Sequence, residues 1–527
     1  MMNGGWAWLA LAATGSLMMA VQGSGQRPPA TGPAGLEARL GPAPIEWTGE
    51  HRRTDAVRLG CGGWLMQYSN PDRQDKPSDR PVASRIRAHL PPEGIAVRAI
   101  VFDLGYTYTP DRSDLQAIAR EEGWAMVGCL LRYKYGTELF LRAMEDFAER
   151  SGRPELLRCP IVLFGFSRNG ARAWDFYEEN PDRTLAIALG GNPGIAVKWG
   201  RQAENAGRVA LARSIPTLTL VGSKDPFVDY DKGEAKFWHN AVYPQIRRQE
   251  GVTWGMMIGW GYGHGWEGSW TPFTVFVQEA LRLRAGGEAT GGKESAAGGF
   301  RPIRFEDGWL GEYGWKHDWP EIGPVAGFGG DKSTAVWLVS GDMAHVWRAY
   351  QVREPRVTLS VRADGDEVVL RAEVPAGVEQ VEFFDRSQSL GVVKAAPFEL
   401  RSGGLKRGTR TVFAVAKLAD GPTPSRPVTL AGGKVLDWRA GDADQKRAEQ
   451  PISVIRLDPP LRAAMRALLA AGGDAARANV SAEQVRALRS ALEALSSDAF
   501  VEQRTAAAAL LGSLGAAGGE RPGELGE

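Results

Sequence analysis

Ile161-Val162-Leu163-Phe164-Gly165-Phe166-Ser167-Arg168-Asn169-Gly170 is an apolar run followed by a serine, with one glycine two residues before the serine and another three residues after it. The apolar run predicts a buried strand, and Ala171-Arg172-Ala173-Trp174, which comes next, predicts a helix. A serine on the sharp turn between such a strand and helix is typical of a nucleophile elbow. A serine hydroxyl is a poor nucleophile at neutral pH, so it needs a position that a base and oxyanion-binding N–H groups can reach.

One residue of this turn departs from the usual pattern. The position two residues after the serine is commonly glycine, and here it is Asn169. Asparagine tolerates left-handed backbone angles better than most residues, so we expect it to replace the glycine. On this motif alone, Ser167 could equally be a turn or cap residue.

Two more predicted strands, each with a polar residue after its end, follow the serine. The apolar run 217–221 is followed by a glycine turn that carries Asp225, and the run 254–258 is followed by the glycine-rich loop 260–266, which carries His264. Serine, then acid, then histidine is the chain order of an α/β-hydrolase triad. Three residues in this order are far more specific than the serine turn alone.

With these motifs, residues 55–285 resemble the α/β-hydrolase superfamily, and within it secreted bacterial serine esterases of the polyhydroxybutyrate depolymerase and feruloyl esterase kind. The spacing of apolar runs fits that fold, because strands and helices alternate. The additional expected strands are 96–102, 124–131 and 185–189, and the expected helices are 113–121 and 137–151. This alternation predicts a doubly wound, mostly parallel sheet that helices cover on both faces.

The resemblance implies a role for each matching residue. Ser167 would attack an acyl carbonyl, and His264 would take its proton and return one to the leaving group. Asp225 would orient the imidazole and stabilise its charged form. Asp229 and Asp231 lie close by in the sequence and remain alternatives for the acid, while Asp225 could instead cap a helix.

The resemblance also implies an oxyanion hole and a substrate site. The backbone N–H of Arg168 would be one oxyanion donor, and the loop at Gly105 and Tyr106 would supply the second. Aromatic residues are dense around the histidine, and aromatic faces suit flat or sugar-like ligands. The predicted substrate-binding residues are therefore Trp260, Tyr262 and Trp266. The alternative is that the aromatic residues of this region, including Trp254 and Trp270, pack in the core.

Candidate substrates are esters of carbohydrates, aromatic esters and polyesters. The stretch from Ser167 to Gly170 is also similar to part of the glucuronoyl esterase elbow, in which an arginine after the serine helps to hold the oxyanion. Phe166 and Ala171 stand where that family has a cysteine and a lysine, so a glucuronoyl ester is the less favoured candidate.

Composition and motifs indicate which partners to exclude. The 527 residues include 63 basic and 62 acidic ones, and a net charge of +1 gives no reason to expect nucleic acid as a partner. Metal-binding spacings of histidine and cysteine, a phosphate loop and a dinucleotide fingerprint are absent from the sequence. We therefore expect neither a metal nor a cofactor. No sequence feature indicates an oligomeric state.

The N-terminal residues 1–25 read as an export signal, because an apolar segment ends in small residues. The protein is then expected to be secreted, periplasmic or at the cell surface, without a stable membrane span once the signal is removed. A single uncleaved anchor is the alternative. Cys61, Cys129 and Cys159 are odd in number, and buried thiols are the default interpretation.

The rest of the chain divides by composition. An α/β-hydrolase catalytic domain is expected over 45–284, a flexible linker over 285–299 and a connecting strap over 300–352. Alternating short strands over 355–432 resemble bacterial immunoglobulin-like modules and predict a small all-β sandwich. A helical hairpin, 481–495 with 498–514, is expected within 455–516, and residues 517–527 are expected to be disordered.

These observations together predict an exported serine hydrolase that cleaves a carboxylic ester through an acyl-enzyme. A serine peptidase remains open. A non-catalytic cell-surface binding protein, in which the hydrolase fold is only a scaffold, is the alternative from a different class.

Overall fold

We describe the protein from a computed structural model. It describes residues 45–53, 78–105, 109–130, 136–167, 169–191, 212–225, 251–265, 270–285, 300–312, 319–438, 459–470 and 479–496. The predicted export signal, Cys61, most of the predicted linker and the predicted disordered tail lie outside these residues.

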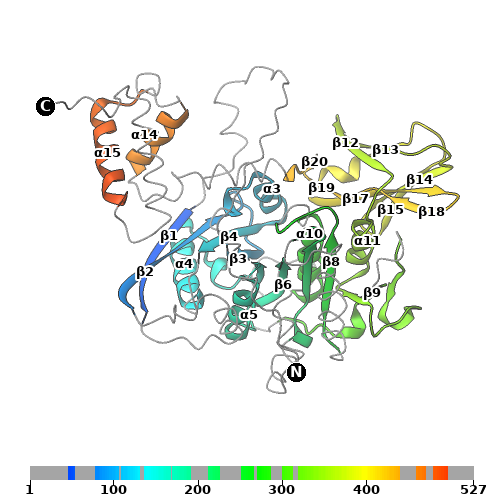
Figure 1. The fold of residues 1–527 in the computed structure, drawn as a ribbon, viewed down its shortest axis with the longest axis horizontal. Helices are drawn as coiled ribbons and strands as arrows, with labels where there is room; N and C mark the ends of the chain where they lie inside the picture. Colours follow the sequence, from blue (N-terminus) through cyan, green and yellow to red (C-terminus); the bar gives the residue numbers. More distant parts are fainter. Residues whose placement is uncertain are drawn as a thin grey trace, which may run out of the picture. The chain divides into compact units, whose positions relative to one another are not determined.

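An eight-stranded sheet forms the first half of the described chain, in the order β1-β2-β4-β3-β5-β6-β7-β8 (Figure 1). Its first three strands pair antiparallel, and all later neighbours pair parallel. The strands are β1 (Ile45–Arg53), β2 (Ser78–His89), β3 (Ala99–Asp103), β4 (Trp124–Leu130), β5 (Ile161–Phe166), β6 (Thr184–Gly190), β7 (Thr217–Gly222) and β8 (Trp254–Gly259). This order, with crossover helices between the parallel strands, confirms the α/β-hydrolase fold.

Helices cover both faces of this sheet, because successive strand residues point to opposite sides. The helices are α3 (Ser113–Glu122), α4 (Gly136–Ser151), α5 (Asn169–Glu179) and α10 (Trp270–Arg284). On one face, Phe102 packs against Phe140 of α4 and Phe176 of α5, with ring centroids 4.4 and 5.5 Å away. Val101 faces the opposite side, where α3 and α10 lie.

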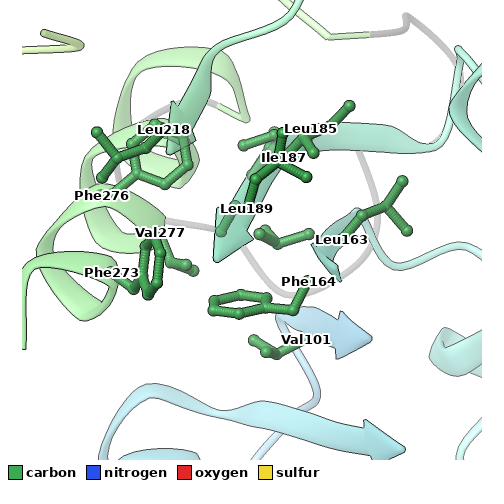
Figure 2. Packing of buried hydrophobic residues seen from close by; sticks show 14 of the residues in the cluster. Val101, Leu163, Phe164, Leu185, Ile187, Leu189, Leu218, Phe273, Phe276 and Val277 are labelled. Carbon is green, nitrogen blue, oxygen red and sulfur yellow. The ribbon is translucent and has the colours of Figure 1, made fainter. Parts of the chain in front are cut away.

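Figure 2 shows the ring of Phe164 between Val101 and the α10 side chains of Phe273 and Val277. β3, β5, β6, β7 and β8 are buried along their whole length, as expected for parallel strands covered on both faces. This double burial explains why the strands were predictable from apolar runs.

Cys129 and Cys159 are both buried thiols. β3 lies between the strand that holds Cys129 and the strand that follows Cys159. Burial raises the pKa of the Cys159 thiol to about 12, and its Sγ donates to the carbonyl oxygen of Val97 (3.1 Å). These two cysteines are therefore structural thiols, as the sequence predicted.

The strap, residues 300–352, packs on the last strand of the sheet. It forms a three-stranded sheet in the order β10-β9-β11, followed by helix α11. The elements are β9 (Trp309–Gly311), β10 (Ile322–Pro324), β11 (Val336–Leu338) and α11 (Gly341–Tyr350). Ser340 caps α11, because its hydroxyl accepts from the Met343 N–H (3.1 Å). A Cβ on Gly255 of β8 would lie 2.5 Å from the Trp337 carbonyl oxygen, so β11 and β8 are in close contact.

Two antiparallel sheets follow the strap and confirm the predicted sandwich. One has the order β12-β13-β16, and the other has β15-β14-β17-β19-β20, with β18 also paired to β17. Their strands are β12 (Thr358–Asp364), β13 (Glu367–Glu373), β14 (Gln380–Asp385), β15 (Gln388–Val393), β16 (Glu399–Ser402), β17 (Thr409–Leu418), β18 (Gly421–Pro424), β19 (Val428–Ala431) and β20 (Lys434–Val435). Leu370, Phe383 and Val412 are among the residues that form a separate core between the sheets.

The sandwich contacts the hydrolase fold closely. The carboxylate of Glu122 in α3 accepts from the Thr409 N–H of β17 (3.0 Å), and Thr429 donates to the Thr271 hydroxyl of α10 (3.0 Å). Phe413 and Ala431 also belong to the hydrophobic core of the hydrolase fold. The module is therefore packed on the hydrolase fold.

Two helices near the C-terminus pack on each other, α14 (Pro459–Ala470) and α15 (Ala482–Ser496). Ser481 caps α15 through reciprocal bonds with Gln484, as the sequence indicated. The predicted partner helix 498–514 lies outside the described residues. No helix in the described part of the chain is long and apolar enough to cross a membrane.

Candidate active site

The predicted elbow is formed by the end of β5 and the start of α5. Ser167 stands between them in a left-handed conformation, with φ 53°. Its N–H donates to the Gly190 carbonyl oxygen (2.7 Å), and its carbonyl oxygen accepts from the Gly170 N–H (3.0 Å). A left-handed serine is uncommon and strained, which is typical of functional turns. Asn169 does not use the left-handed angles that asparagine tolerates, because it is the first residue of α5.

The small residues around Ser167 are needed because the helix lies against the strand. A Cβ on Gly165 would lie 2.7 Å from both the carbonyl oxygen of Asn169 and the Cα of Gly170. A Cβ on Gly105, in the loop after β3, would lie 2.1 Å from Asn169 Nδ2. Asn169 therefore fills the space above Gly105.

Asp225 and His264 are brought together by the ends of β7 and β8. The Nδ1 atom of His264 lies 2.7 Å from Asp225 Oδ2. The Asp225 side chain is 0% exposed and that of His264 is 22% exposed, so the carboxylate is sealed while the imidazole reaches solvent. The predicted pair is thus in hydrogen-bonding contact. Asp229 and Asp231, the alternative acids, lie outside the described residues.

Backbone contacts join the two loops that carry this pair. The Lys224 N–H donates to the Tyr262 carbonyl oxygen (2.8 Å), and the Gly261 N–H donates to the Ser223 hydroxyl (2.9 Å). A Cβ on Gly222 would lie 2.2 Å from the carbonyl oxygen of Gly263. The glycine at the end of β7 therefore allows the histidine loop to approach the acid loop.

The imidazole of His264 lies between Phe166 and Gly191. The Phe166 and His264 ring centroids are 4.7 Å apart. Gly191 has φ 59°, and a Cβ there would lie 2.9 Å from His264 Cε1 and from Phe166 Cζ. The Ser167 N–H is hydrogen-bonded to Gly190, the residue before Gly191. The serine and the histidine therefore both border the end of β6. Sequence reasoning missed Phe166 and Gly191 as site residues, although the glycine pair after a buried strand was a usable signal.

The predicted oxyanion donors are only partly described. The Gly105 N–H donates to Asp103 Oδ1 (3.0 Å), so that N–H already has an acceptor, and the role of Gly105 in an oxyanion hole stays a prediction. Asp103 is buried and also accepts from the Thr109 hydroxyl (2.7 Å). Arg168 and Tyr106 lie outside the described residues.

The aromatic residues near His264 are mostly structural. Trp260 is 8% exposed, and its Nε1 donates to the Gln351 carbonyl oxygen (2.7 Å), so this indole has a structural contact, and its assignment to substrate binding stays a prediction. Trp254 donates to the Thr219 hydroxyl (2.7 Å), and Trp270 stacks on Phe164 at 5.1 Å. Tyr262 is partly exposed in the histidine loop, and Trp266 lies outside the described residues.

Among the described residues, no group of three or more histidine, cysteine, aspartate or glutamate side chains is arranged to hold a metal ion. His264 and Asp225 form a hydrogen-bonded pair, and Ser167 and His264 contact the neighbouring residues Gly190 and Gly191. Serine, histidine and aspartate are residue types that serve nucleophilic and acid–base chemistry.

Comparisons with known proteins give weak likenesses. No family model and no curated protein matches the chain. Est1E from Butyrivibrio proteoclasticus is 13% identical, covers 38% of this chain and 95% of its own, and has a TM-score of 0.27. An S-formylglutathione hydrolase from Agrobacterium tumefaciens is 14% identical, with 46% and 97% covered and a TM-score of 0.28. Fibronectin(III)-like modules of Clostridium thermocellum CbhA are 25% identical, with 14% and 92% covered and a TM-score of 0.13.

These TM-scores are too low to support an assignment. The fold is instead defined by the strand order of the sheet and by the strand, turn and helix around Ser167. By these features the chain has an α/β-hydrolase fold followed by a β-sandwich.

Proposed function

We propose that this protein is a serine hydrolase that cleaves a carboxylic ester through an acyl-enzyme, with Ser167 as nucleophile, His264 as base and Asp225 as the orienting acid. The observation that carries the proposal is the 2.7 Å contact between His264 and the fully buried Asp225, beside the left-handed turn of Ser167. A buried carboxylate requires a partner, and a turn of this conformation is costly, so both features favour a functional site over a scaffold.

The proposed mechanism follows from which imidazole nitrogen is engaged. Because Nδ1 faces Asp225, Nε2 is available to the serine hydroxyl. Nε2 takes the hydroxyl proton as Oγ attacks the carbonyl carbon. The bond to the leaving alkoxide then breaks, and His264 gives the proton to the departing alcohol. Water repeats these steps on the acyl-serine, which releases the acid and restores Ser167.

The oxyanion would form at the start of α5. The first N–H groups of a helix have no partner within the helix, and the helix dipole favours negative charge there. The Arg168 N–H, immediately before α5 (Asn169–Glu179), remains our predicted donor, with a second from the loop at Tyr106.

The finer predictions concern substrate and location. Esters of carbohydrates, aromatic esters and polyesters remain the candidates, with glucuronoyl esters less favoured. Tyr262 and Trp266 remain predicted contacts for the substrate. Export stays a prediction from residues 1–25.

Turnover of a short p-nitrophenyl ester tests the chemistry. We expect Ser167→Ala and His264→Ala to lower kcat by about 10⁴-fold or more, and Asp225→Asn by about 10³ to 10⁴-fold. Ser214→Ala, which removes an exposed hydroxyl in contact with Tyr177, is the matched control and should keep the wild-type rate.

A screen of acetylated sugars, feruloyl, glucuronoyl and polyester substrates, with peptide anilides included, then identifies the substrate class. Folded protein that turns over none of these compounds contradicts the proposal and favours the non-catalytic scaffold. Turnover of peptide anilides alone favours a peptidase.

A further inference from the structure

The outer edge of β8 is covered by side chains of the strap. Trp347 Nε1 of α11 donates to the Met256 carbonyl oxygen (2.8 Å), and the Ile258 N–H donates to Gln351 Oε1 (3.2 Å). Since β8 is the last strand of its sheet, these backbone groups point away from β7. Side chains therefore take the place of a further strand at this edge.

The same segment of the strap also holds the first residue of the histidine loop. Trp260 follows the last residue of β8, and its Nε1 donates to the Gln351 carbonyl oxygen (2.7 Å). The Arg353 guanidinium lies 5.2 Å from the centroid of the Trp260 ring. Trp260 and Gln351 are 8% and 7% exposed. One buried residue, Gln351, therefore binds both the end of β8 and the start of the loop.

The sandwich holds this strap segment from the other side. Arg426, between β18 and β19, donates to the Tyr350 carbonyl oxygen (2.9 Å) and to that of Arg353 (3.3 Å). Tyr350 is buried, and its hydroxyl oxygen would lie 3.4 Å from a Cβ on Gly259. Residues 350–353 are thus fixed between the sandwich and the base of the histidine loop.

The loop itself has little rigidity of its own, because glycine occupies every second position from Gly259 to Gly265. Two backbone hydrogen bonds lie within the loop, from the Tyr262 N–H to Gly259 and from the Gly265 N–H to Gly263, and contacts outside the loop complete its shape. One set joins it to the acid loop, through Ser223 and Lys224, and the other set is the Trp260 contact with Gln351. In the sequence, His264 follows the residues that make both sets of contacts.

We propose that Gln351 and Trp260 are positioning residues for His264, which join the strap to the histidine loop and hold the imidazole over Ser167. This inference rests on the proposed function for the role of His264, and it gives the strap a part in the site. The expected signature of lost positioning is a lower kcat with KM nearly unchanged, because substrate contacts stay in place.

Two substitutions in the full-length protein test the proposal. Gln351→Met has a similar volume and removes the side-chain oxygen that accepts from the Ile258 N–H. Trp260→Phe keeps an aromatic ring and removes the indole N–H that donates to the Gln351 carbonyl oxygen. We expect each to lower kcat by about tenfold with KM changed less than about twofold. Gln351→Glu keeps an acceptor of the same length and should recover part of the kcat lost in Gln351→Met.

The matched control is Trp337→Phe, which removes a buried indole hydrogen bond of the same kind, from Nε1 to the Phe305 carbonyl oxygen (3.1 Å) within the strap. It should leave kcat and KM unchanged. A second readout is the Cε1–H signal of His264 in ¹H–¹³C spectra, assigned with His264→Ala. This atom lies beside Gly191 and the Phe166 ring, so its shift reports the position of the imidazole.

The spectra separate failure of this inference from failure of the proposed function. Wild-type protein without Ser167-dependent turnover contradicts the proposed function only, and the His264 signal still decides the positioning. A signal displaced in Gln351→Met and Trp260→Phe, but not in Trp337→Phe, supports the proposal. A signal that stays in place in both variants, or a kcat equal to that of the control, overturns it. If Gln351→Met does not fold, Trp260→Phe alone decides.

Discussion

Gly191 shows how a single backbone position determines the site. It has left-handed backbone angles, and a Cβ built on it would lie 2.9 Å from the His264 ring. Ser167 also has a left-handed φ, and because it carries a side chain this backbone conformation is strained. Gly191 thus provides room for the His264 ring, and Ser167 holds the position of the proposed nucleophile.

Gly191→Ala tests this requirement for space. We expect the new methyl group to displace the imidazole and to lower kcat by about 100-fold, since small misplacements at a reacting centre are costly. Gly152→Ala is the control, because Gly152 has φ 66° and nothing within 4 Å of the position of a Cβ. Both variants should lose about 1 kcal/mol of folding stability from the backbone strain. Equal kcat values in the two variants would show that the Cβ contact with His264 is unimportant.

The residues of the proposed triad could be suggested from sequence because their order along the chain follows the order of strands. Ser167 comes directly after β5, and Asp225 and His264 lie in the turns that follow β7 and β8, whose ends a parallel sheet gathers at one edge. The structural contacts of Trp260 and Gly105 could not be predicted in this way. Sequence does not show that an indole turns toward Gln351, or that an N–H is already taken by Asp103.

At the scale of elements, long buried strands and amphipathic helices were predictable within a few residues, because their apolar patterns are strong. The strands of the strap were not, since β9, β10 and β11 have three residues each and are too short to show a period. The contacts of helix α11 with the sandwich also required the structure.

His345 makes the docking of α11 sensitive to pH. The centroid of its ring is 6.1 Å from that of Trp309 in the strap and 6.5 Å from that of Phe384 in the sandwich. Burial first, and then the neighbouring Arg348 guanidinium, lower the pKa of His345 from 6.5 to about 4, while Asp342 acts in the opposite direction. The unfolded chain therefore binds more protons than the folded chain between these two pH values.

Stability is expected to fall as the pH decreases from 6.5 to about 4 and to level off below that range. After allowance for solvent screening of a partly exposed group, we expect His345 to account for about 1 to 2 kcal/mol of this loss. Urea unfolding across this range, for the wild type and His345→Gln, measures it. A His345→Gln protein with the same pH dependence as the wild type would assign the loss to other groups.

At the scale of the whole molecule, the hydrolase fold and the strap share one hydrophobic core, which a few sandwich residues join, while the sandwich has a second core between its own sheets. An immunoglobulin-like module is often a detachable spacer, and here β17 and β19 contact α3 and α10 instead. We therefore expect these three parts to unfold in a single transition in calorimetry. Two well-separated transitions for the described parts would contradict this view.

Glu122→Ala tests the contact between α3 and the sandwich. The substitution leaves the Thr409 N–H without its carboxylate acceptor, and we expect it to lower the free energy of unfolding by about 1 to 2 kcal/mol. Glu379→Ala removes an exposed carboxylate, 3.9 Å from Lys417, and should change stability by less than about 0.5 kcal/mol. A similar change in both variants would mean that the docking contact contributes little.

The central claim is that Ser167 is an activated nucleophile. A fluorophosphonate probe reacts with such a serine, and peptide mass spectrometry locates the adduct. We predict one adduct, on Ser167, that is absent from Ser167→Ala, strongly slowed in His264→Ala and unchanged in Ser214→Ala. Intact folded protein that takes up no probe, or takes it up on another residue, would contradict the account.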